Sequence, residues 1–503
     1  MQYGRQIIYT DEFEINENNI LSVLQDAYEA HLKNAEDCQE LIKIEKGDVE
    51  NNREKIYRKE IDNWVFDNVA NEVTSFKKYF NWGNSVSFVQ RGEKDTGKED
   101  EQNAIAIINE YYDCENIKSK MQELAYYVEV TGIGYVIAEI NQKWRDGKSP
   151  FKVNVLNPET TFVVRSKGTD KEILLAVTYR TDKTGKIYFT CYTDTDRYDI
   201  VKGAERSKEW GEITNHLGNL IGIIPIVEYI RDYDRMGCFE RQVDEILGVS
   251  HLVSDFLNGV EQNVNAIYWG NDIEFQKDEQ GNDIKPQNGE WLLTQTTQDG
   301  KQPKIAPVVM DYNYSGILEQ ITFRTNRIKQ KCNVPLTSDA ANNSTGIAVS
   351  DSSGWTNAEQ EANSQDLIKY GCKNQELEIV LAICKITEIA DVDERVKTLT
   401  AKDAQATINR QKNYEMSVKT TALANMLSHG IYGLHALTSV NMFEDVNQVW
   451  NDSKGLIEKY QSSLFDKGET TDNVQSTDGG YEAQVSNSPR IDGMSKEAPL
   501  ESE

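Results

Sequence analysis

The sequence predicts a mainly helical α+β fold, on three observations. Apolar residues recur at three- and four-residue steps over 18–44 and 56–82, which is the spacing of amphipathic helices. Strand-like segments then follow one another from 134 to 201 with no helix between them, which favours an antiparallel sheet. An unbroken apolar stripe over 241–268 predicts one helix of roughly 40 Å, because an α-helix rises about 1.5 Å per residue.

Two further elements complete the first half of the chain. Alternating side chains predict a strand at 85–90, and apolar spacing predicts a single helix over 101–130. Turn signals such as Asn157–Pro158 and Thr184–Gly185 separate the strands that follow. We therefore expect these strands to form one antiparallel sheet.

In the second half, two helices flank a small insertion. Residues 271–313 contain turn residues and a strand-like run, EWLLTQT, and the next helix is expected over 315–332. Together with the helix over 241–268, this order predicts an antiparallel helix pair with a small module at its tip.

The C-terminal part is predicted to be helical before it loses its pattern. Thr356 and Glu359 have the spacing of a capping box, which predicts the start of a long helix. Further helices are expected over 401–427 and 439–460. The tail 466–503 has no apolar period, so it is expected to be disordered.

Composition limits the classes of function. The formal charge is -28, so diffuse binding to DNA or to an anionic membrane is disfavoured unless basic residues gather locally. The longest apolar windows, such as IGIIPIV at 221–227, are far shorter than the roughly 20 residues that span a bilayer, and the N-terminus has no apolar signal core. We expect no membrane partner, and a protein that is cytoplasmic or packaged from the cytoplasm. The seven cysteines have no C-x-x-C spacing and are expected to be free thiols.

No motif requires an enzyme. GEKDTGK, at Gly92–Lys98, matches the G-x-x-x-x-G-K pattern of phosphate-binding loops, but Glu99 occupies the position that should carry a hydroxyl for Mg²⁺. Carboxylates there would repel a triphosphate, so a solvated loop is preferred and a nucleotide-dependent enzyme that uses this loop is the alternative. Gly132 and Gly134 follow a helix and precede a strand, the reverse of a dinucleotide fingerprint, and predict a turn. The five histidines lack metal-binding spacings, so no metal or cofactor is expected.

Two neighbouring stretches carry the candidate functional residues. Leu336–Thr356 reads LTSDAANNSTGIAVSDSSGWT, in which most side chains are small or polar and only Ile347, Val349 and Trp355 could anchor a core. Just before it, four cations occupy the C-terminal half of the expected helix over 315–332, namely Arg324, Arg327, Lys329 and Lys331. These cations either complement the helix dipole and pair with acids on a neighbouring chain, or contact phosphates briefly.

The order of these elements, together with several phrases, resembles the portal proteins of tailed bacteriophages, the head-to-tail connectors, of the type found in siphoviruses of Gram-positive hosts. The resemblance spans about residues 50–390, and no single phrase carries it. The phrases are NWGNSVSFVQ, GYVIAEI with NVLNPETTFVV, STGIAVS, and above all IPIVEYIRDYDRMGCFERQVDEILGVSHLVSDFLNGVEQNVNAIYWGND.

The resemblance implies a mainly helical portal fold with a specific division of the chain. The parts would be an N-terminal helical arm at 1–50, an α/β wing at 51–236, stem helices at 237–269 and 314–335, a small β-containing clip at 270–313, a tunnel loop at 336–356, a long wing helix at 357–399, a helical crown at 400–465 and a disordered tail at 466–503.

The resemblance also implies a function and partners. Such proteins form a dodecameric ring at one capsid vertex of the virion, through which a separate terminase ATPase drives double-stranded DNA during packaging, and through which DNA is later ejected. The implied partners include the major capsid and scaffold proteins and a head-tail adaptor at the clip. DNA would touch the tunnel loop only transiently and non-specifically, at Asn342, Asn343, Ser344, Thr345 and Ser350. A virion adaptor protein that forms no channel is the other alternative.

Overall fold

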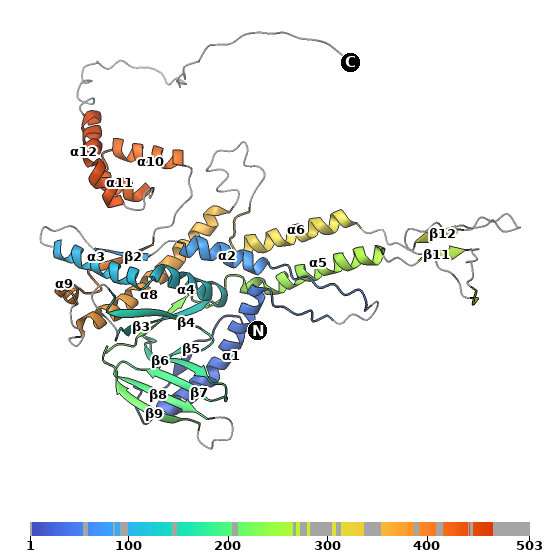
Figure 1. The fold of residues 1–503 in the computed structure, drawn as a ribbon, viewed down its shortest axis with the longest axis horizontal. Coiled ribbons are helices and arrows are strands. Elements are labelled where there is room, and N and C mark those ends of the chain that lie inside the picture. The colour runs from blue at the N-terminus through green and yellow to red at the C-terminus, as the bar shows by residue number, and fades with distance from the viewer. Residues whose placement is uncertain are drawn as a thin grey trace, which may run out of the picture. The chain divides into compact units, whose positions relative to one another are not determined.

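The computed structural model has the mixed α+β fold that the sequence predicted (Figure 1). The chain divides into two compact units, Met1–Arg410 and Gln411–Glu503. The structure describes residues 3–53, 59–83, 86–90, 99–142, 148–203, 210–264, 268–271, 279–281, 304–307, 313–336, 354–386, 392–408, 416–440, 442 and 446–465.

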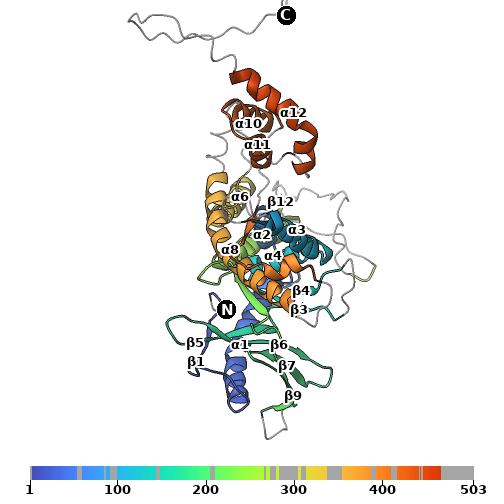
Figure 2. The same cartoon turned by 90° about the vertical axis from the view of Figure 1, so that its left-hand side faces the viewer.

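The larger sheet of the first unit has six strands in the order β1-β5-β6-β7-β8-β9. Their bounds are β1 (Ile8–Thr10), β5 (Thr161–Ser166), β6 (Ile173–Thr181), β7 (Ile187–Tyr192), β8 (Asp196–Lys202) and β9 (Glu212–Gly218). All neighbours pair antiparallel except β1 with β5. Helix α1 (Ile20–Lys46) packs on one face, where Leu24 meets inward-facing residues such as Phe189 and Ile200 (Figure 2). The helix expected over 18–44 is thus confirmed.

The expectation of a single sheet is wrong, because β3 (Ile133–Ile140) and β4 (Phe151–Leu156) form a separate sheet with β10 (Ile226–Ile230). In this sheet β3 lies in the middle and pairs antiparallel with both neighbours. Strand β10 enters only after the chain has passed through the larger sheet. A pairing between strands so far apart in sequence leaves no local pattern, which is why the sequence did not reveal it.

The helix expected over 101–130 is two helices, α3 (Glu99–Cys114) and α4 (Ile117–Thr131). They are separated at Asn116, whose φ of 53° is left-handed. Its backbone N–H donates to the carbonyl of Asp113, which ends the first helix. Asparagine adopts this conformation more readily than most residues with a side chain.

The helix expected over 56–82 begins only at Val69, as α2 (Val69–Trp82), and residues 59–68 are not helical. The reason is a ladder of hydrogen bonds to α5 (Val243–Val264). The backbone N–H groups of Asn63, Val65 and Asp67 donate to side-chain oxygens of Asn258, Ser254 and Ser250 at 2.8, 3.0 and 3.0 Å. Two residues of extended chain span about 6.6 Å, and four residues of helix about 6.0 Å, so the two periods match.

This ladder gives a testable prediction. In the double variant S250A/S254A, the free energy of unfolding should fall by about 1–3 kcal/mol for each lost bond. Two backbone N–H groups beside buried side chains lose their acceptors in this variant. Chemical denaturation measures this, and proteolysis within 59–68 should accelerate. As a control on the same helix, Gly248→Ala should raise stability slightly, since a Cβ there meets nothing within 4 Å. Equal protease resistance of S250A/S254A and wild type would refute the role of the ladder.

The predicted helix pair is confirmed as α5 and α6 (Tyr314–Lys331). The short strands β11 (Tyr268–Asn271) and β12 (Lys304–Pro307) lie between the two helices in sequence and pair antiparallel (Figure 1). The strand expected at EWLLTQT lies outside the described residues. A short 3-10 helix, η1 (Glu240–Gln242), precedes α5.

The long helix after the polar segment is α8 (Trp355–Lys385), followed by the short α9 (Glu394–Thr398). The expected capping box is wrong, because Gly354 occupies the N-cap with a left-handed φ of 87° and Thr356 already lies inside the helix. The expected strand at 85–90 is confirmed as β2 (Val86–Gln90).

Strand β2 pairs antiparallel with β13 (Ala404–Ile408), so the helix expected over 401–427 is wrong in its first part. Tertiary pairing overrides helix propensity here, since Ala406 and Phe88 are paired and buried in the core shared with α3 and α8.

The second unit contains α10 (Met416–Ser428), α11 (Gly433–Val440) and α12 (Val446–Phe465). The helix expected over 439–460 is therefore divided between α11 and α12. The backbone of α11 lies close against α12 at Gly433, where a Cβ would be 2.3 Å from the ring of Trp450. The tail 466–503 lies outside the described residues.

Candidate functional site

Helices α5 and α6 form an antiparallel pair that rests on α2. Near the body, Ile246 and Val249 share a buried cluster with Ile328 and with Val69 and Val73 of α2. Farther out, the rings of Phe256 and Tyr314 meet edge to face at 5.8 Å. The pair is thus anchored at one end by the body and held together along its length.

The cations of α6 mostly contact acids of the same chain. Arg324 Nη1 lies 3.0 Å and Lys331 Nζ 3.9 Å from the carboxylate of Glu245, on α5. Lys329 Nζ lies 2.5 Å from Glu72, on α2. Arg327 is exposed and makes no ion pair with a residue in the described ranges. Three of the four predicted residues therefore help to hold α6 against its neighbours.

The predicted loop residues Asn342, Asn343, Ser344, Thr345 and Ser350 lie outside the described residues, but both ends of their segment are described. A Cβ added at Gly354 would lie 3.9 Å from the Cα of Pro335. Pro335 and Gly354, on either side of the segment, therefore lie next to each other.

Asn333 ends α6 just before this point, in a left-handed conformation with φ 51°. Its N–H donates to the carbonyl of Gln330, and the N–H of Val334 donates to that of Lys329, so the last turn of the helix is closed. The side chain of Asn333 is directed to Glu361 in α8, where Nδ2 donates to Oε2 at 2.8 Å.

Glu361 also binds two cations. Lys77 Nζ, from α2, lies 2.8 Å from Oε2, and the guanidinium of Arg231, which follows β10, donates to Oε1. Lys77 is almost fully buried, with 1% of its side chain exposed, and it also donates to the carbonyl of Asn333 at 3.4 Å. Glu361 thus joins four parts of the body at the base of the polar segment.

Behind Glu361 lies Glu129 of α4, whose side chain is fully buried. It accepts hydrogen bonds from Arg231 Nε at 3.1 Å and from Trp82 Nε1 at 3.0 Å. Burial alone would raise the pKa of Glu129, but the charges of Arg231, then Lys369 and Lys77, outweigh it and hold the pKa below its usual value. Glu129 is therefore a charged group that keeps Arg231 in place.

An aromatic cluster fixes the other flank of the segment. The rings of Phe76 and Phe80, one turn apart on α2, stack at 5.3 Å, and each meets Trp355 edge to face at 5.8 Å. The sequence suggested that Trp355 could anchor a core, and this is wrong: its ring contacts Phe76 and Phe80, but the residue is 43% exposed. It missed Glu361, Lys77, Arg231 and Glu129, because single charges on four separate elements form no motif.

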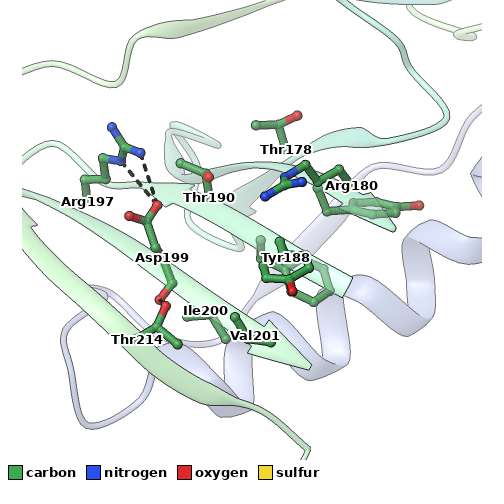
Figure 3. A pocket seen from close by; sticks show the side chains of 11 residues that line it. Thr178, Arg180, Tyr188, Thr190, Arg197, Asp199, Ile200, Val201 and Thr214 are labelled. Carbon is green, nitrogen blue, oxygen red and sulfur yellow. Dashed lines mark hydrogen bonds and ion pairs between the residues drawn. The ribbon is translucent and has the colours of Figure 1, made fainter. Parts of the chain in front are cut away.

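A hollow of about 430 Å³ lies on the face of the larger sheet opposite α1 (Figure 3). Arg197 and Asp199 form an ion pair at 3.2 Å on one side, and Arg180 lies over the ring of Tyr188 on the other. The remaining lining is largely threonine hydroxyls and aliphatic side chains. These groups form no nucleophile–base pair, and the hollow gives no indication of catalysis.

The other motif predictions have simple outcomes. All seven cysteines are free, and only Cys114 is exposed. Gly132 forms the predicted turn, as the left-handed cap of α4. The loop Gly92–Lys98 lies outside the described residues. Within the described ranges, no group of three or more His, Cys, Asp or Glu side chains could hold a metal ion.

Comparison with known proteins identifies the family. No helix in the part of the chain that the structure describes is long and apolar enough to cross a membrane. No curated protein matches the sequence. The model of the family described as "Phage portal protein, SPP1 Gp6-like" matches residues 21–400, which is more than half of the chain and includes nearly all of α1, N-terminal to the region of resemblance. The chain therefore belongs to the phage portal protein family.

Proposed function

We propose that this chain is the subunit of a ring-shaped channel at one vertex of a phage capsid, through which double-stranded DNA is packaged and ejected. The observation that carries the proposal, within this family, is the pairing of α5 and α6 beside a polar segment whose ends meet at Pro335 and Gly354. Such a segment can extend from a fixed base without belonging to a core.

Each part of the chain would then correspond to one part of the portal fold. The wing is assigned to 51–236, the stem to 237–269 with 314–335, the clip to 270–313, the tunnel loop to 336–356, the long wing helix to 357–399 and the crown to 400–465, with the arm at 1–50 and the tail at 466–503. The separate compact unit from Gln411 onward is in keeping with an independent crown.

The chemistry of the polar segment suits contact with moving DNA. Asn342, Asn343, Ser344, Thr345 and Ser350 are small or uncharged, so they would touch phosphates without the counterion release that makes binding tight. The net charge of -28 acts in the same direction, because like charge keeps the duplex from adhering to the wall. The channel would hold DNA without gripping it.

The cations of α6 would have two different roles, one within the subunit and one outside it. Arg324, Lys329 and Lys331 hold α6 against α5 and α2. Exposed Arg327 is the cation that we assign to a phosphate or to an acid of the adjacent subunit. Subunits related by rotation make head-to-tail contacts that close into a ring, and we propose twelve of them.

The proposed partners follow from this place in the virion. They are the packaging terminase ATPase and a head-tail adaptor at the clip, together with the major capsid and scaffold proteins. We propose no catalytic role, no cofactor and no membrane partner for the chain.

Electron microscopy of the purified protein tests the proposal directly. We expect rings with a central hole wide enough for a DNA duplex, because closure buries the exposed flanks of the stem. Dilution provides a second measurement, because a ring held by repeated contacts should dissociate cooperatively into subunits. A protein that stays monomeric at high concentration, with no central hole in any particle, would contradict the proposal.

A further inference from the structure

We propose that Glu361 is a positioning residue that fixes the base of the segment 337–353. Its effect on DNA passage rests on the proposed function, whereas its effect on the base does not. The carboxylate stands between the two ends of the segment: it belongs to the second turn of α8, and it binds Asn333 at the end of α6.

Each oxygen of Glu361 serves a different pair of donors. Oε2 accepts from Lys77 Nζ and from Asn333 Nδ2, both at 2.8 Å. Oε1 accepts from Arg231 Nη2, and from Gln365 Nε2 at 3.3 Å. One side chain thus ties α2, the chain after β10, the end of α6 and the start of α8 to a common point.

The charges at this point explain why a carboxylate is needed. Lys77 and Arg231 bring two positive charges to Glu361, and 1% and 10% of their side chains are exposed. Glu129 neutralises Arg231 from the other side, at 3.1 Å. Without the Glu361 charge, buried Lys77 would have no carboxylate within ion-pair distance among the described residues and would repel Arg231. The base would be pushed open where Asn333 and Lys77 now meet.

The conformation of Asn333 makes the end of α6 sensitive to this bond. A left-handed residue with a side chain is less favourable than glycine, and the amide bond to Glu361 helps to hold it. With the bond in place, the chain leaves α6 in one direction toward Pro335. In a ring, identical bases would start every copy of the segment at the same height and the same distance from the axis.

Hydrogen–deuterium exchange on the assembled protein tests this assignment. In Glu361→Gln, which keeps the shape and removes the charge, amides in Cys332–Leu336 and Gly354–Ala358 should exchange about tenfold faster than in wild type. Glu378→Gln, an exposed position on the same helix, is the matched control and should leave both regions unchanged.

Asn333→Gly supplies a second variant, because it retains the left-handed conformation and removes only the amide. It should accelerate exchange in Cys332–Leu336 and leave Gly354–Ala358 as in wild type. Where Glu361→Gln does not fold, this variant decides the matter. Unchanged exchange at both flanks, or an equal rise along the whole of α8, overturns the assignment.

Imaging separates this proposal from the proposed function. Glu361→Gln should form rings as the wild type does, but these rings should package less DNA. If the proposed function is wrong, images of the wild-type protein will already show no ring. Normal packaging by rings whose base exchanges faster would limit the role of Glu361 to the base and refute its effect on DNA passage.

Discussion

Glu228→Gln is expected to lower the free energy of unfolding by about 3–5 kcal/mol, because it removes the charge at the centre of a buried ionic cluster. The Glu228 carboxylate binds the guanidinium of Arg235, and Arg165 Nη2 lies 2.8 Å away. Tyr135 donates its hydroxyl at 3.1 Å. The side chains of Glu228 and Arg235 are 1% and 7% exposed, so water cannot replace the lost partner.

Denaturant unfolding measures this effect, and Glu212→Gln on the exposed edge strand β9 is the control. The control should stay within about 0.5 kcal/mol of wild type. A loss below about 1 kcal/mol in Glu228→Gln would show that the cluster is not held by its charge.

The same carboxyl predicts how stability depends on pH. Burial would raise the pKa of Glu228, but Arg235, then Arg165, outweigh it and lower the pKa from 4.5 to about 2. An acid with a lowered pKa in the folded protein stabilises it fully above the unfolded pKa and loses this contribution as the pH falls. The difference between wild type and Glu228→Gln should therefore be constant above pH 4.5 and shrink as the pH falls toward 2.

Gly132→Ala is the second change with a large expected effect. It should lower the free energy of unfolding by more than about 3 kcal/mol or prevent folding. Gly132 caps α4 with a φ of 81°, and a Cβ there would lie 2.5 Å from the backbone of Arg235 and 2.6 Å from that of Met236. Backbone atoms cannot rotate away as a side chain can, so the contact between α4 and the chain after β10 must open.

Gly185 offers a matched control for this substitution. It has the same φ of 81°, but a Cβ would meet nothing within 4 Å. Gly185→Ala therefore carries only the conformational penalty of a left-handed residue, about 1–2 kcal/mol. Thermal unfolding and soluble yield compare the two variants. Similar losses at both positions would mean that the close approach at Gly132 is unimportant.

The sequence predicted a helix or strand correctly where the residues of that element themselves form a clear periodic pattern. The apolar stripes of α1, α5 and α6 predicted these helices because each buries a single face. The strands from β4 to β8 were recognisable because alternation and turn residues recur within a few positions. The family was also recognisable, since the order of elements is a property of the chain.

Local pattern failed where a distant partner decided the conformation. Residues 59–68 have helical spacing but are not helical, because α5 offers acceptors to the backbone N–H groups of Asn63, Val65 and Asp67. Residues 404–408 form a strand because β2 presents an open edge to them. In both cases hydrogen bonds to a remote element outweigh the small free-energy differences of intrinsic propensity.

The candidate site shows the same division. The residues alone show that Leu336–Thr356 is small and polar and that cations precede it. That Pro335 and Gly354 meet, and that Glu361 joins Lys77, Arg231 and Asn333, depends on packing between elements that are far apart in the sequence. A single charge on one element does not predict this cluster from the sequence. A charge is stable in the interior only where folding brings its counter-charge within reach, and here the counter-charges come from other elements.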